Sequence, residues 1–175
     1  MATAESNAPD AEELAKMRHS AAHVLAEAVL EMFPEAKYAI GPPIDTGFYY
    51  DFDLPRSLTP ADLTVLQKRM KKSVKRNVPI TGEQISKKDA KKIFAHQPYK
   101  LELIDDIEED TVGHFTHGKF EDLCRGGHAD STGQIGSFQL THVAGAYWKG
   151  DENNPMLQRI YGALYASQEE LDSYL

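Results

Sequence analysis

The sequence predicts an α+β fold in which helices pack on one face of a mainly antiparallel sheet. Two observations support this fold class. Apolar residues recur at three- and four-residue spacing over residues 12–33, which is typical of an amphipathic helix. Beyond residue 100, short segments alternate between apolar and polar residues and are separated by Gly, Asp and Asn, as antiparallel strands usually are.

The first two helices have clear boundaries in the sequence. Pro34 ends the helix predicted over residues 12–33, because proline cannot continue a helical hydrogen-bond pattern. Thr59 can cap the next helix with its side-chain oxygen, and Pro60 supplies a backbone angle suited to the first turn. We expect this second helix to run to about Arg76.

Two shorter helices are predicted from their capping residues. Ser86 and Asp89 form an approximate capping box, which indicates a short helix after residue 86. Ser167 and Glu170 form a better one, which indicates a last helix that continues to Leu175.

The strands are predicted from turns and alternation. A turn at residues 41–43 should lead into a half-buried strand in which Phe48, Tyr50 and Phe52 share one face. Further strands are predicted at residues 100–104, 120–124, 138–148 and 157–165. Residues 1–10 are small and polar and are interpreted as a flexible arm, which leaves residues 11–175 as one domain.

A glycine-flanked segment at residues 113–119 resembles a phosphate-binding loop. Phe120, however, stands where such a loop needs Ser or Thr to hold magnesium, so we expect no ATP binding. His114 and His117 are interpreted as polar residues of this loop.

The charge is distributed unevenly. The net charge is −8, but residues 68–92 hold ten of the 19 Lys and Arg and two of the 27 acidic residues, so this window carries +8 and the remainder −16. Such a patch either contacts phosphates or is a solvated helix face, and the sequence alone leaves both open. Six of the basic residues fall on the second predicted helix: Lys68, Arg69, Lys71, Lys72, Lys75 and Arg76.

The remaining composition points to a cytoplasmic protein. Cys124 is the only cysteine, so no intrachain disulfide can form. No apolar run reaches the ~20 residues that span a bilayer. The acidic N-terminus contains no arginine and fits neither a signal peptide nor a transit peptide.

Four residues form two similarly spaced pairs that could do chemistry. His19 and His23 stand four apart on the first predicted helix, so their rings project from one face. Cys124 and His128 have the same spacing within a glycine-containing loop. Together these residues could hold zinc in a tetrahedral site, or they could bind and activate a water molecule without metal.

Asp122 and Lys100 are candidates with plain alternatives. Asp122 shares a strand face with Cys124 and could orient a histidine or hold an amino group, but it could equally face solvent. Lys100 begins a predicted strand and, on sequence alone, is an exposed strand lysine.

Four segments together resemble a known family. They read HSAAH at residues 19–23, AIGPPIDTGFYYD at 39–51, DLCRGGH at 122–128 and AGAYWKGDENNPMLQRIYG at 144–162. Over residues 17–175 the chain resembles the editing (N2) domain of bacterial-type threonyl-tRNA synthetase. The two His and Cys pairs are also found in the alanyl-tRNA synthetase editing domain, whereas the last segment is typical of the threonyl enzyme.

The resemblance implies hydrolysis of the ester bond in tRNA(Thr) mischarged with serine. It places His19, His23, Lys100, Asp122, Cys124 and His128 in the catalytic site. Lys100 and the histidines would position or deprotonate water, or protonate the leaving ribose oxygen. Asp122 would hold the substrate ammonium group, and Cys124 would line the site. Gly41 and Tyr50 would contact the terminal adenosine or the seryl group, and the six basic residues of the second helix would contact tRNA.

No metal is required by the threonyl type, but zinc is possible on His19, His23, Cys124 and His128. The sequence departs from the family at Gly127, where proline is usual. With no aminoacylation core in the sequence, we expect either an excised editing domain that works with the remainder of a synthetase or a free-standing editing protein. The alternatives are a non-catalytic module that binds the tRNA acceptor arm and a zinc-dependent deacylase of the alanyl type.

Overall fold

The computed structural model describes residues 9–175, and nearly all of the arm predicted at residues 1–10 lies outside that range. Helix α1 (Ala11–Met32) begins at Asp10, whose carboxylate accepts a 2.8 Å hydrogen bond from the backbone N–H of Glu13. Asp10 is therefore part of the helix cap rather than of a flexible arm.

The predicted helix starts at Thr59, Ser86 and Ser167 are confirmed, because each of these side chains caps a helix. At Thr59 the capping box is completed by Asp62, which accepts a hydrogen bond from the Thr59 backbone N–H. Within residues 9–175, no helix is long and apolar enough to cross a membrane. The remaining helices are α2 (Pro60–Arg76), α3 (Lys87–Ile93), α4 (Pro98–Asp106) and α5 (Gln168–Tyr174).

The strands form two antiparallel sheets. The larger has five strands in the order β1-β3-β8-β7, with β2 paired to the free part of β3, and the smaller has the order β4-β5-β6. The larger sheet contains β1 (Lys37–Tyr38), β2 (Pro43–Ile44), β3 (Gly47–Asp53), β7 (Ser137–Tyr147) and β8 (Met156–Tyr165). The smaller contains β4 (Ile80–Ser86), β5 (Thr111–His117) and β6 (Phe120–Leu123).

The α+β class is confirmed, but two local predictions are wrong and one strand is missing from the prediction. Residues 100–104 lie in helix α4, not in a strand. Residues 113–117 belong to strand β5, so His114 and His117 are strand residues rather than loop residues. Strand β4 was not predicted, and its pairing with β5 creates the second sheet.

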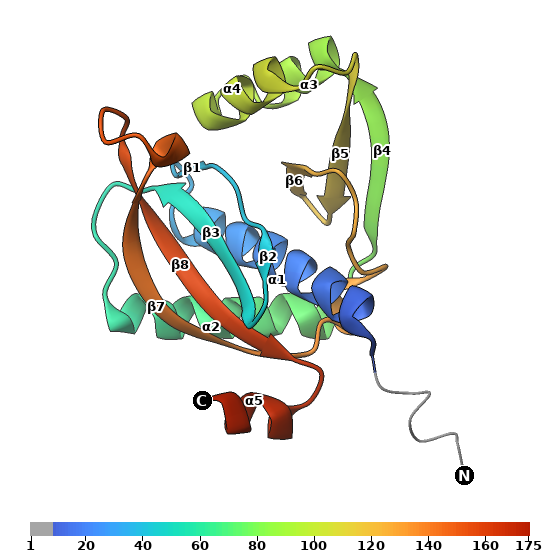
Figure 1. The fold of residues 1–175 in the computed structure, drawn as a ribbon, viewed down its shortest axis with the longest axis vertical. Coiled ribbons are helices and arrows are strands. Elements are labelled where there is room, and N and C mark those ends of the chain that lie inside the picture. Colours follow the sequence, from blue (N-terminus) through green and yellow to red (C-terminus); the bar gives the residue numbers. More distant parts are fainter. Residues whose placement is uncertain (1–8) are drawn as a thin grey trace.

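Helix α1 is the centre of the packing (Figure 1), where it runs between the two sheets; α3 packs against the smaller sheet, and α4, which follows it, contacts β1 of the larger sheet. Ten of its residues are buried, from Arg18 to Val29. On β3 the side chains of Phe48, Tyr50 and Phe52 are at most 1% exposed, which confirms the predicted inward face of this strand. A helix held from several sides keeps its side chains in fixed positions, which suits it to carry a site.

Candidate functional site

Helix α1 presents two histidines to a cleft of about 680 Å³, which is lined by residues of α1, β3, α4, β5 and β6. The ring centroids of His19 and His23 are 4.8 Å apart, as expected for residues one turn apart on a helix. His23 is buried, with 4% of its surface exposed, whereas His19 is partly exposed at the cleft.

Strand β6 and the loop after it bring Asp122 and Cys124 to the same cleft. The backbone N–H of Cys124 donates a 3.0 Å hydrogen bond to the Gly113 carbonyl, which continues the pairing with β5. Gly126 and Gly127 then adopt φ angles of +115° and +81°. Proline fixes φ near −65°, so the proline that is usual in the resembled family could not adopt this conformation at position 127.

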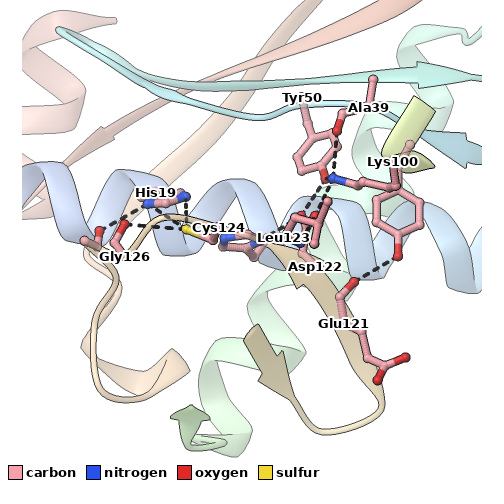
Figure 2. A network of polar contacts seen from close by, with 12 residues as sticks. His19, Ala39, Tyr50, Lys100, Glu121, Asp122, Leu123, Cys124 and Gly126 are labelled. Carbon is pink, nitrogen blue, oxygen red and sulfur yellow. Dashed lines mark hydrogen bonds and ion pairs between the residues drawn. The ribbon is translucent and has the colours of Figure 1, made fainter. Parts of the chain in front are cut away.

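Lys100 reaches the cleft from α4 and is 2% exposed, so its interpretation as an exposed strand lysine is wrong. Its ammonium group donates to the carbonyl oxygen of Ala39 at 2.7 Å, to the Tyr50 hydroxyl at 2.9 Å, and to the Asp122 carboxylate. Figure 2 shows the ammonium group between these three acceptors. All three of its protons therefore have partners, as a buried charge requires.

Asp122 accepts hydrogen bonds from four donors. They are the Lys100 ammonium, the Tyr50 hydroxyl at 2.5 Å, the His23 Nδ1–H at 3.0 Å and the Leu123 backbone N–H at 2.7 Å. Burial alone would raise the pKa of Asp122, but the charge of Lys100 and the hydrogen bond from His23 outweigh it and hold that pKa below its usual range. Asp122 is thus a buried carboxylate, and it fixes the orientation of the His23 ring.

Burial also acts on the donors around Asp122. It lowers the pKa of Lys100, although the neighbouring carboxylate opposes this effect. It raises the pKa of Tyr50 well above its usual value, and the charge of Asp122 raises it further. Tyr50 therefore keeps its proton and donates it in the hydrogen bond to Asp122.

His19 and Cys124 form a second pair at the cleft, with the sulfur 3.0 Å from His19 Nε2. His19 Nδ1 lies 3.2 Å from the Gly127 carbonyl oxygen, so this nitrogen carries the proton and Nε2 is left to accept one from the thiol. Burial lowers the pKa of His19 to about 4, and the nearby His23 lowers it too. Burial raises the pKa of the Cys124 thiol to about 12. Both groups are neutral near pH 7.

His23 differs from His19 because one of its ring nitrogens has no hydrogen-bond partner among residues 9–175. Nδ1 is bonded to Asp122, whereas Nε2 is buried and has no hydrogen-bond partner within residues 9–175. Since the ionised Asp122 accepts the Nδ1 proton, the neutral imidazole carries its lone pair on Nε2. A buried nitrogen of this kind can accept a proton from a bound water or hydroxyl.

Two predicted site residues show contrasting placements. Gly41 lines the cleft, and a Cβ at this position would lie only 2.1 Å from a carbon of the Tyr50 ring, so the close approach of backbone and ring requires glycine. His128 packs edge-on against Phe115, with ring centroids 4.1 Å apart, and its Nδ1 lies 2.7 Å from the Ala129 carbonyl oxygen. Within the described range, the residues lining the cleft do not include His128.

Three of the four predicted zinc ligands lie together. One ligand atom each from His19, His23 and Cys124 fall within 4.8 Å of one another, and the described residues add no fourth ligand to this group. The donors fit an ion with three protein ligands and one open position, but they do not form the closed four-ligand site that includes His128. An ion there would be held by the two histidines and the thiolate, and it would lower the pKa of a bound water.

The basic residues of α2 form a separate surface. Four of them line a hollow of about 370 Å³ together with Glu31 of α1 and Val65, and Arg69 pairs with Glu31 at 3.3 Å. None of the six basic residues of α2 is among the described residues that line the cleft. The four in the hollow are Lys68, Arg69, Lys72 and Arg76.

Two contacts that build the site have no clear signal in the sequence. The backbone carbonyl of Ala39 holds Lys100, and the Tyr38 hydroxyl donates to the Glu121 carbonyl at 2.9 Å beside Asp122. A carbonyl contact leaves no signature in the side-chain pattern. The aromatic residue Tyr38 is the one available hint, because it precedes the turn at residues 41–43 and could be expected in a strand there.

Residues 112–161 match the family model described as the threonyl and alanyl tRNA synthetase second additional domain. This segment includes β6 with Asp122 and also Cys124. Over these residues the chain is similar to this family. The matched segment contributes the cleft side that holds the carboxylate and the thiol, while α1 and α4 complete the site from outside it.

Curated relatives of this chain include threonine–tRNA ligases. The chain is 59% identical to the enzyme of Dehalococcoides mccartyi over 159 residues, 52% to that of Thermotoga neapolitana over 161 residues, and 47% to that of Rubrobacter xylanophilus over 159 residues. These alignments cover 90–91% of this chain and 25–27% of each relative. The chain thus spans about a quarter of the length of the relatives it matches, and it corresponds to a part of an aminoacyl-tRNA synthetase.

Proposed function

We propose that this domain hydrolyses the ester bond of tRNA(Thr) mischarged with serine. A synthetase site that holds threonine cannot reject serine strongly, because one methyl group changes binding by only ~1 to 3 kcal/mol. A separate hydrolytic site can add the missing discrimination. The similarity of residues 112–161 to the threonyl and alanyl family and the similarity of the chain to threonine–tRNA ligases support this substrate class.

The observation that carries the proposal is the environment of His23. Its Nδ1 is fixed by Asp122, and its Nε2 is buried at the cleft with no partner within residues 9–175. In the proposed reaction a water molecule gives a proton to Nε2 while its oxygen attacks the ester carbonyl. The tetrahedral intermediate then breaks its bond to the ribose oxygen, which receives the proton from His23, and free serine and tRNA are released.

Asp122 and Lys100 support the base in this mechanism. The carboxylate stabilises the protonated imidazole that forms when His23 accepts the proton. Lys100 and Tyr50 in turn keep the carboxylate ionised and in place. The expected role of Asp122 as partner of the substrate ammonium does not fit this arrangement, because Asp122 is 2% exposed and four protein donors already occupy its oxygens.

Cys124 acts in the proposed reaction as a lining group. Its raised pKa keeps the thiol protonated near pH 7, so it is a poor nucleophile. The thiol donates to His19, and the pair can hold the substrate or the attacking water at the cleft by hydrogen bonds.

The proposed partner is the acceptor end of tRNA(Thr), whose aminoacylated 3′ terminus enters the cleft. The basic residues of α2 contact its phosphates, and other parts of the synthetase hold the rest of the tRNA. The basic hollow on α2 supports this, since four cationic side chains surround it.

A zinc-dependent deacylase of the alanyl type is the second candidate. The convergence of ligand atoms from His19, His23 and Cys124 favours it. The two candidates differ in their response to a chelator, because only the second loses its activity when metal is removed.

One experiment separates the candidates: the decay of seryl-tRNA(Thr), threonyl-tRNA(Thr) and seryl-tRNA(Ala) with purified protein, with and without chelator. We expect rapid loss of seryl-tRNA(Thr), slow loss of the other two, and no effect of the chelator. Loss of activity with chelator would support the zinc enzyme. Survival of seryl-tRNA(Thr) at the uncatalysed rate, together with measurable tRNA binding, would leave a non-catalytic acceptor-arm module.

A further inference from the structure

The segment that connects β7 to β8, residues 148–155, packs against α4; we call it the hairpin tip. Trp148 is 4% exposed and meets the Tyr99 ring edge-on, with centroids 5.0 Å apart. Its indole N–H donates to a carboxylate oxygen of Glu102 at 3.1 Å. Lys149 lies between two acidic residues of the same helix, 2.8 Å from Asp106 and 4.0 Å from Glu102.

Two structural features connect the hairpin tip with Lys100. Tyr99, which contacts Trp148, directly precedes Lys100 in α4. Tyr99 and Trp148 also belong to a small apolar cluster with Ala39 and Leu157, and Ala39 supplies the carbonyl that accepts from the Lys100 ammonium. The hairpin tip therefore packs on the helix that carries Lys100, and it shares an apolar cluster with Ala39, whose carbonyl accepts from the Lys100 ammonium.

Helix α4 depends on such contacts for its position. It has nine residues, belongs to neither sheet, and its N-cap residue Gln97 makes no side-chain capping bond. A helix of this length is not stable by itself in water. At its start, the Gln97 side chain bonds to the backbone of Ala36 and Tyr38. The hairpin tip holds the outer side of the helix through Trp148 and Lys149.

We propose that the hairpin tip, and Trp148 in particular, is a positioning element that keeps Lys100 against Asp122. This inference deepens and rests on the proposed function, in which Asp122 orients His23. Without the Trp148 contacts, α4 shifts, the ammonium group leaves the carboxylate, and the His23 base loses its fixed orientation. The inference assigns a role to the AYWKGDENNP segment, which the proposed chemistry does not use directly.

The test compares three variants of the 175-residue chain. Trp148→Ala removes both the ring contact and the indole donor, whereas Trp148→Phe keeps a smaller aromatic ring on Tyr99 and loses the donor. The matched control is Leu171→Ala, which removes a residue that is 1% exposed in α5, a helix that packs on β7 and β8. All variants are compared at a temperature where circular dichroism shows them folded.

The first readout does not depend on activity. An amine-acylating reagent is applied briefly, and modification of Lys100 is followed by mass spectrometry. We expect Lys100 to be protected in the wild type and in Leu171→Ala, and to react at least about tenfold faster in Trp148→Ala, because labelling follows local opening of α4. Trp148→Phe should give an intermediate rate.

The second readout is the kinetics of seryl-tRNA(Thr) hydrolysis. A small displacement of a positioned group costs up to about a hundredfold in rate, so kcat should fall by roughly tenfold to a hundredfold in Trp148→Ala with KM little changed. Trp148→Phe should recover part of this loss, and Leu171→Ala should keep the wild-type kcat.

Lys100 remaining protected in folded Trp148→Ala would overturn the inference, and so would an equal loss of kcat in Leu171→Ala. If Trp148→Ala does not fold, Glu102→Ala takes its place, because it removes the acceptor of the indole N–H without changing the ring. An unchanged labelling rate of Lys100 in this variant would also overturn the inference. A wild-type protein that hydrolyses no seryl-tRNA contradicts the proposed function, while the labelling result still decides the positioning role.

Discussion

The two ring nitrogens of His23 have opposite surroundings, and this asymmetry is what suits the residue to accept a proton. Nδ1 bonds to a buried carboxylate, and Nε2 is buried without a partner in the described part of the chain. His23→Gln should therefore reduce kcat for seryl-tRNA(Thr) by about 10²- to 10⁴-fold, the range typical of a lost general base. Single-turnover hydrolysis at saturating protein measures this rate.

The neighbouring residue His19 provides the control for this prediction. His19→Gln removes a ring that is bonded to Gly127 and Cys124 but not to the carboxylate. Its effect on kcat should be clearly smaller. An equal effect of the two substitutions on kcat would mean that the contact with Asp122 does not identify which histidine is the general base.

His19 itself should make stability depend on pH. Its pKa is lowered to about 4 in the folded protein, compared with 6.5 for an ordinary histidine, so the unfolded chain binds more protons between these values. Stability is unaffected above pH 6.5 and falls as the pH drops toward 4. The free energy of unfolding should decrease by on the order of 2 kcal/mol between pH 7 and pH 5 from this residue.

Urea unfolding at a series of pH values, in the wild type and in His19→Gln, isolates this contribution. The variant should lose most of the decrease, because the group that titrates is absent. A variant that follows the wild-type curve between pH 7 and pH 5 would show that the ring is not held neutral by burial.

At the scale of the elements, capping residues were the most reliable signals. Thr59, Ser86 and Ser167 each mark a helix start in the structure, because a side-chain oxygen meets a backbone N–H that would otherwise lack a partner. The long helix over residues 12–33 was also clear, since its apolar face repeats along the whole segment and is buried.

The elements that were missed have weak or misleading patterns. Leu101 and Leu103 alternate as in a strand, but Pro98 starts a helix there, and the buried residues Lys100 and Ile104 are four apart. Over a run this short, alternation cannot separate strand from helix.

The smaller sheet was missed for a different reason. Strand β4 buries only Ile80 fully, and β5 buries two histidines at positions where a strand usually has apolar residues. His114 bonds to Glu121 at 3.2 Å, which explains how this polar side chain fits inside, while His117 Nε2 lies 3.3 Å from a Glu27 carboxylate oxygen without forming a hydrogen bond. Such pairing depends on distant segments and cannot be inferred from one stretch of sequence.

The candidate site was partly predictable. The α1 spacing placed His19 and His23 together, and the alternation of β6 placed Asp122 beside Cys124. The burial of Lys100 could not be predicted from its neighbours, because its partners come from three separate segments of the chain.

Helix α2 allows a prediction about tRNA binding. Lys71, Lys72, Lys75 and Arg76 are all exposed, and replacing them with alanine, a strong helix former, should leave the fold intact. If they bind phosphates, the affinity for tRNA falls and the slope of log K against log salt decreases by about one for each phosphate that is no longer neutralised. Filter binding over a range of salt concentrations gives the slope.

A matched control uses Lys88 and Lys92, exposed lysines of α3 from the same basic window. Replacing both with alanine tests whether any loss of positive charge has the same effect. A slope that does not change in the α2 variant would show that this helix face is only solvated.

For the whole molecule, the charge distribution limits how much of a tRNA can be contacted. The basic window of residues 68–92 carries +8, and the rest of the chain carries −16. An acidic body repels the phosphate backbone, so the contact area should be small and confined to the acceptor end. The family match and the cleft are consistent with this. The aminoacylated 3′ end of a tRNA needs only the cleft and contacts to a short stretch of the tRNA phosphate backbone.

This limit predicts that the isolated acceptor arm is sufficient as a substrate. A minihelix containing only the acceptor stem of tRNA(Thr), charged with serine, should be hydrolysed with a kcat/KM within about tenfold of that for the whole tRNA, since a tenfold change corresponds to only ~1.4 kcal/mol of binding. Parallel measurements at low and moderate salt distinguish the removal of tRNA contacts from a change in screening. A minihelix that is hydrolysed at the uncatalysed rate, while whole tRNA is hydrolysed rapidly, would show that this domain reads tRNA beyond its acceptor end despite its acidic body.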